Sequence, residues 1–127
     1  MKNNSTLNIS ARIRSFAIAL RGIRILLATQ KNAWIDAVAT LAVVVAGLMF
    51  GLTAIEWGLI VVAIIAVWAA EGLNTALEFL ADAVLPEYHP LVGRAKDVAA
   101  GAVLIAAAGA AAIGGLVFGP HIWDAVR

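Results

Sequence analysis

Cysteine is absent from this sequence, which excludes a disulfide framework and any metal site built on thiolates. Charged residues are also scarce: they make up 13% of the 127 residues, whereas hydrophobic residues make up 63%. An average soluble domain is about one-quarter charged and about half apolar. So few charges cannot cover a soluble globule, and we predict that residues 1–127 form a single, all-α integral membrane domain.

Motifs that would indicate a familiar nucleotide or metal site are missing as well. The sequence contains neither the GxxxxGK[ST] phosphate loop nor the GxGxxG dinucleotide fingerprint. Its two histidines, His89 and His121, are too few and too far apart for a zinc site. Residues 1–8 are too polar for the core of a signal peptide, and we expect them to be frayed.

Long apolar stretches are what the sequence has in abundance. Residues 37–55 and 98–119 carry no charge, and each is close to the about 20 residues that a membrane-spanning helix needs. The stretch from residue 57 reaches that length only if its helix continues through polar positions. The predicted transmembrane helices are therefore residues 34–55, 57–84 and 97–119, with Pro120 ending the third.

Residues 9–31 have a different pattern. Apolar residues recur at three- and four-residue steps, and Arg14, Arg21 and Arg24 lie together on another face. A basic amphipathic helix of this kind lies in the membrane interface with its arginines toward lipid phosphates. The alternative is a core-facing helix of a soluble domain, which fits poorly with the three spans that follow.

The distribution of positive charge predicts the orientation. Eight of the nine Lys and Arg residues lie in residues 2–31 or in the 85–97 loop, and the ninth is Arg127. The positive-inside rule places the N-terminus and this loop in the cytoplasm and the C-terminus outside. Trp68 lies within a span and is expected to be a packing residue. Three other tryptophans stand near span ends, where interfacial aromatics belong: Trp34, Trp57 and Trp123.

A polar stripe runs along the second predicted span: Glu71, Asn74, Glu78 and Asp82. At about 100° per residue these side chains fall within roughly 80° of one another. A carboxylate at mid-membrane costs about 2.5–3.5 kcal/mol, so such residues are functional candidates. Asp82 has an equally good explanation as the cytoplasmic end of the helix. Because a single chain cannot easily shield this stripe from lipid, we expect a homo-oligomer.

The loop that follows the stripe, PEYHPLVGRAKD, is crowded with polar side chains. Arg94 and Lys96 are suited to binding phosphates, but a solvated loop obeying the positive-inside rule explains them equally well. Gly115 and Gly119 in the third span are spaced for close helix packing.

These segments resemble two signatures of the prokaryotic diacylglycerol kinase family, which includes bacterial diacylglycerol kinases and undecaprenol kinases. The stripe resembles its ExxNxxxExxxD signature, and residues 87–97 resemble its second. The basic helix, with Arg21-Gly22-Ile23-Arg24, also matches in kind. The resemblance covers roughly residues 10–120.

The resemblance implies a homotrimeric lipid kinase of the bacterial inner membrane, with active sites shared between chains, that uses ATP and Mg²⁺ and binds no nucleic acid. Glu71 matches the general base, Asn74 a residue that orients the reacting groups, and Glu78 a metal ligand. The nucleotide-binding positions are Glu87, Tyr88, His89, Lys96 and Asp97.

One position departs from the family. The setting that usually holds a second metal-binding glutamate reads Gln30-Lys31-Asn32. Gln30 offers a neutral carbonyl to the metal, or it is only a solvated residue near the helix end, and Asp36 is a candidate to supply the missing charge. These residues do not choose between diacylglycerol and undecaprenol. The alternative from another class is a small transport or assembly subunit that uses the stripe as a proton or cation site.

Overall fold

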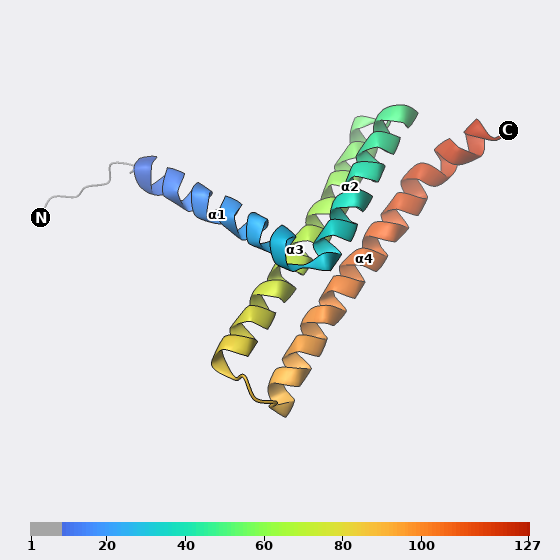
Figure 1. Cartoon of the computed structure of the whole chain (residues 1–127). Helices are drawn as coiled ribbons and strands as arrows, with labels where there is room; N and C mark the ends of the chain where they lie inside the picture. The colour runs from blue at the N-terminus through green and yellow to red at the C-terminus, as the bar shows by residue number, and fades with distance from the viewer. Residues whose placement is uncertain (1–8) are drawn as a thin grey trace, which may run out of the picture.

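The computed structural model describes residues 9–127, so the expectation for residues 1–8 lies outside the described part. Within that range the chain is all helical and contains no strand, which confirms the predicted fold class. Figure 1 shows the four helices, α1 (Ile9–Thr29), α2 (Lys31–Phe50), α3 (Ala54–Val84) and α4 (Pro90–Ala125).

The three helices after α1 are long and apolar enough to cross a membrane, as the sequence predicted. The 31 residues of α3 and the 36 of α4 extend about 46 and 54 Å at about 1.5 Å per residue. Both lengths exceed the about 30 Å of a bilayer core, so part of this pair lies beyond it. α1 leaves the bundle at a steep angle (Figure 1).

The packed core lies where the first turns of α3 meet the end of α4. Leu52, Ile60 and Val117 form its buried centre. Gly47 allows α2 to approach α3 closely, because a Cβ at this position would lie 2.6 Å from the Trp57 ring. These contacts hold α2, α3 and α4 together at the end of the bundle that carries the C-terminus.

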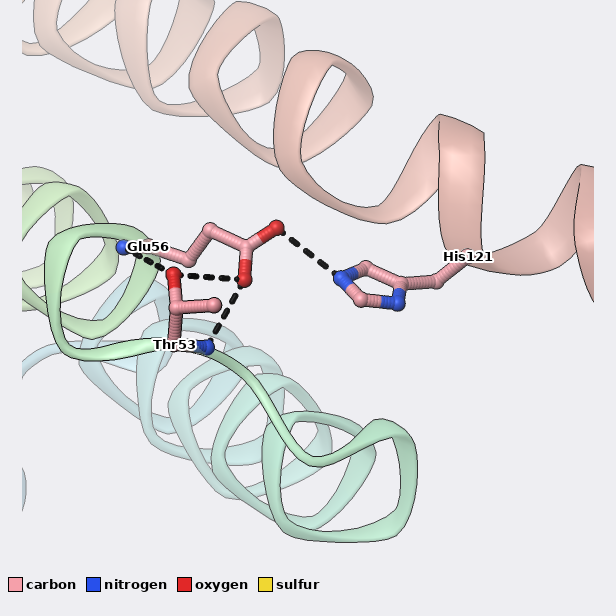
Figure 2. Close-up of polar contacts among 3 residues, drawn as sticks. All are labelled: Thr53, Glu56 and His121. Atoms are coloured by element: carbon pink, nitrogen blue, oxygen red, sulfur yellow. Dashed lines mark hydrogen bonds and ion pairs between the residues drawn. The ribbon is translucent and has the colours of Figure 1, made fainter.

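Polar contacts reinforce the same end (Figure 2). Thr53 and Glu56 form a capping box, in which the Thr53 backbone N–H donates to Glu56 Oε2 at 2.8 Å and the Glu56 N–H donates to Thr53 Oγ1 at 3.3 Å. The other carboxylate oxygen of Glu56 lies 2.9 Å from Nε2 of His121 on α4. The His121 ring also lies against Phe50 of α2, with centroids 5.8 Å apart. Three helices therefore meet at this capping box.

Two hydrogen bonds from tryptophan side chains hold α2 against α1 and α3 against α2. Nε1 of Trp34 donates to the carbonyl of Leu27 at 2.8 Å, which satisfies one of the free carbonyls at the end of α1. Nε1 of Trp68 donates to Thr40 Oγ1 at 3.0 Å and joins α3 to α2. Trp68 is therefore a packing residue, as the sequence suggested.

The helix ends differ from the predicted ones. The helix predicted over 97–119 extends from Pro90 to Ala125. Pro90 is the first residue of this helix, where the missing N–H would be unpaired in any case. Pro120 lies inside the helix, because the loss of one N–H late in a long helix does not end it. The expected loop is therefore shorter, and Arg94, Lys96 and Asp97 lie on the first turns of α4.

Candidate active site

The polar stripe of α3 runs from a buried to an exposed end. The side chain of Glu71 is 2% exposed, Asn74 and Glu78 are partly buried, and Asp82 is exposed. The expectation that a second chain is needed to shield the stripe is therefore wrong for Glu71, because the other helices of its own chain cover it. The stripe instead leads from the interior toward the end of the α3–α4 pair that carries the 85–89 connection.

Asn74 and Glu78 form the centre of the stripe. Nδ2 of Asn74 donates to Oε1 of Glu78 at 3.2 Å. Oδ1 of Asn74 is buried and accepts no hydrogen bond from residues 9–127. This pairing aligns two oxygen-bearing side chains one helical turn apart and leaves an amide oxygen without a partner.

These oxygen donors fit Mg²⁺. Magnesium is usually held by one or two carboxylates together with the substrate's phosphates and water, rather than by an all-protein cage. No group of three His, Cys, Asp or Glu side chains in the described range is arranged to hold a metal, so Glu78 and Asn74 suit an ion that arrives with a nucleotide. Gln30 lies at the break between α1 and α2, as N-cap of α2, and its side chain makes no capping hydrogen bond.

A second carboxyl group approaches Glu71 from α2. Asp36 is partly buried and is close enough to Glu71 for their charges to interact, as is Glu78. Oδ2 of Asp36 is buried and has no hydrogen-bond partner among residues 9–127. The sequence suggested Asp36 only as a substitute for a charge at Gln30, whereas the structure places it beside the buried end of the stripe.

The residues predicted to bind the nucleotide gather near the start of α4. Glu87 and Tyr88 are exposed in the 85–89 connection, and the Tyr88 ring lies over Gly93. His89 is the N-cap of α4, where its Nδ1 accepts from the Leu91 N–H at 3.2 Å.

Two further members of this set lie on the first turns of α4. Nζ of Lys96 lies 2.5 Å from Oδ1 of Asp82, so this ammonium group is paired, and Asp97 is exposed. Asp82 is 11 residues after Glu71, about 16 Å along the helix. The structure therefore brings Lys96 to the stripe but leaves the 87–89 set at a distance from Glu71.

An apolar groove between α1 and α3 lies next to the buried end of the stripe, with a volume of about 770 Å³. Sequence reasoning missed it, together with Thr75, which is buried in its wall. The sequence did contain a signal for Thr75, because this residue follows Glu71 by four positions and therefore lies on the same face of α3. The groove is lined by Ala19, Gly22, Ile23, Ile25, Leu26, Ile65, Trp68, Ala69, Gly72, Thr75, Ala76 and Phe79.

Fold and site together define an integral membrane protein with a buried carboxylate one helical turn from an apolar groove. The model of the family described as prokaryotic diacylglycerol kinase matches residues 17–118. The undecaprenol kinase of Bacillus subtilis (strain 168) is 39% identical over 109 residues, covering 86% of this chain and 89% of that protein. The diacylglycerol kinase of Escherichia coli (strain K12) is 34% identical over 106 residues, covering 84% and 86%.

The chain therefore belongs to the prokaryotic diacylglycerol kinase family. It is an ATP-dependent lipid kinase of the bacterial inner membrane, as the sequence predicted. Membership of an enzyme family also sets aside the alternative of a transport or assembly subunit.

Proposed function

We propose that this protein transfers the γ-phosphate of ATP to the hydroxyl group of diacylglycerol or undecaprenol, in the recycling of phospholipid or of a lipid carrier. The observation that carries the proposal is the buried carboxylate of Glu71 beside an apolar groove. The relatives named above support it, because they are an undecaprenol kinase and a diacylglycerol kinase.

The depth of the stripe suits a reaction between a lipid and a soluble nucleotide. If Trp57 marks the outer boundary, Glu71 lies about 21 Å and Glu78 about 31 Å below it along α3. With a bilayer core of about 30 Å, Glu71 lies within the inner leaflet and Glu78 at its cytoplasmic boundary. A lipid hydroxyl then approaches Glu71 from the membrane, while ATP approaches Glu78 from water.

Each residue then has a role that follows from its chemistry. Glu71 accepts the proton of the lipid hydroxyl as general base, and the oxygen attacks the γ-phosphorus while ADP leaves. Asn74 holds Glu78 in place through the bond from Nδ2. Glu78 and the free Oδ1 of Asn74 are the groups that would hold Mg²⁺, which neutralises phosphate charge when bound. Lys96 exchanges Asp82 for a phosphate oxygen.

The test is a phosphoryl-transfer assay with purified protein, labelled ATP, Mg²⁺ and each of the two lipids in turn. We expect label in at least one lipid. Label in neither lipid, from protein that is folded and binds Mg·ATP, would overturn the proposal. The ratio of the two rates identifies the preferred lipid.

We also propose that the N-terminus is cytoplasmic, the C-terminus external and the assembly a homotrimer with shared sites. The distribution of Lys and Arg supports the orientation. Gly115 and Gly119 on α4 support the assembly. A Cβ added at either would meet no atom of the other described helices within 4 Å, which leaves room for a neighbouring helix. A reporter fused after Arg127 that reads as cytoplasmic would contradict the proposed orientation. Cross-linking in native membranes that yields only monomer would contradict the proposed homotrimer.

A further inference from the structure

The hydroxyl group of Thr75 is an exception among the helical hydroxyl groups of this protein. Hydroxyls within helices usually bond to the carbonyl four residues earlier, as Ser15 does to Ala11 at 3.0 Å and Thr29 to Ile25 at 2.8 Å. Thr75 is 4% exposed, yet its Oγ1 has no hydrogen-bond partner among residues 9–127. A buried polar group without a partner is costly, so a hydroxyl here suggests a ligand that completes it.

The surroundings of Thr75 indicate what kind of ligand this is. Thr75 lines the groove between α1 and α3, where Trp68 is the only other side chain with a polar atom among the described residues. The indole N–H of Trp68 is already bonded to Thr40. On the opposite wall, a Cβ added at Gly22 would meet no atom of the other helices in residues 9–127 within 4 Å, so there is space facing α3. The groove therefore accepts a largely apolar molecule with one hydrogen-bonding group level with Thr75.

The position of Thr75 along α3 sets the depth at which the hydrogen-bonding group of the ligand lies. Thr75 is four residues after Glu71, about 6 Å along the helix, on the side of the proposed cytoplasmic boundary. A lipid with its tails along Ile65 and Ala69 therefore brings its glycerol backbone and hydroxyl to the stretch of α3 between Glu71 and Thr75. In diacylglycerol, an ester carbonyl lies next to the reacting hydroxyl, whereas undecaprenol has only hydrocarbon beside its hydroxyl.

We propose that the Thr75 hydroxyl donates a hydrogen bond to an ester carbonyl of diacylglycerol and thereby positions that lipid's free hydroxyl for Glu71. Thr75 is a positioning residue that favours ester-bearing alcohols over polyprenols. This inference rests on the proposed function, since it concerns the lipid of the same reaction.

The test compares the wild type with Thr75→Val, which keeps the shape of the side chain and removes the hydroxyl. We expect kcat/KM for diacylglycerol to fall about 2- to 12-fold, the range that one neutral hydrogen bond supplies. The values for undecaprenol and the KM for Mg·ATP stay unchanged. Thr75→Ser keeps the donor and should retain the wild-type preference, and Thr29→Val, whose hydroxyl is already bonded to a backbone carbonyl, is the matched control.

Thermal stability separates this role from a structural one. Because the hydroxyl has no hydrogen-bond partner among residues 9–127, Thr75→Val should be at least as stable as the wild type. Equal losses with both lipids, no loss with either, or a wild type that phosphorylates only undecaprenol would each overturn the inference. A wild type that phosphorylates neither lipid is a failure of the proposed function itself.

Discussion

Replacing Glu71 by Gln tests the centre of the proposed mechanism. The side chain is 2% exposed and makes no hydrogen bond that the amide would lose within residues 9–127. Gln also has nearly the same volume, so we expect the fold and the affinity for Mg·ATP to persist. What disappears is the ability to accept the proton of the lipid hydroxyl.

General-base catalysis typically contributes about 10²–10⁴-fold, which is about 2.7–5.4 kcal/mol of transition-state stabilisation. We therefore expect kcat of Glu71→Gln to fall by that factor, measured in single-turnover assays at saturating lipid and Mg·ATP. Residual activity above about a tenth of the wild-type rate would refute the assignment. Asp36 is the neighbouring carboxyl on α2, so the double variant with Asp36→Asn shows whether any residual rate depends on that group.

Three further predictions follow from the site and the packing. Glu78→Gln removes a charged oxygen donor and should raise the Mg²⁺ concentration for half-maximal rate by about tenfold or more. Gln30→Glu should lower that Mg²⁺ concentration. Identical Mg²⁺ titrations for this variant and the wild type would mean either that Gln30 is not at the metal or that Asp36 already supplies the charge. Repeating both titrations with Asp36→Asn added distinguishes these two explanations. Gly47→Ala places a Cβ 2.6 Å from the Trp57 ring, so overpacking of about 1–3 kcal/mol should exceed the gain of about 1 kcal/mol in helix propensity. Gly47→Ala should lower the thermal midpoint in detergent without changing the KM for the lipid or for Mg·ATP. An unchanged midpoint would contradict this packing.

The spans were predictable because their signal is strong and local. About 20 apolar residues without charge have few stable states other than a membrane helix, and α2, α3 and α4 follow from that pattern. The start of α4 was not predictable in the same way. Proline is compatible both with a helix end and with a first helical turn, and only the capping bond of His89 to the Leu91 N–H distinguishes them.

The site was predictable where it lies on one helix and not where it lies between two. Helical periodicity places Glu71, Asn74 and Glu78 on one side of α3, and the bond between Asn74 and Glu78 agrees with it. The approach of Asp36 to Glu71 and the groove beside Thr75 depend on how α1 and α2 cross α3. Crossing geometry follows from side-chain packing over whole surfaces, which one chain's pattern does not encode in any short motif.

The buried hydrophobic core and the unsatisfied polar groups occupy opposite halves of the molecule. The half with the C-terminus holds the core around Ile60 and the pairing of Glu56 with His121. In the other half lie three buried polar atoms without partners in residues 9–127: Oδ2 of Asp36, Oδ1 of Asn74 and Oγ1 of Thr75. Unpaired buried groups lower stability, so they are expected where a ligand completes them, and the rest of the fold must offset their cost. The packed end that carries the C-terminus provides that offset and holds α3 and α4 in register. The other half leaves its free oxygens available for the lipid, metal and nucleotide of the proposed reaction.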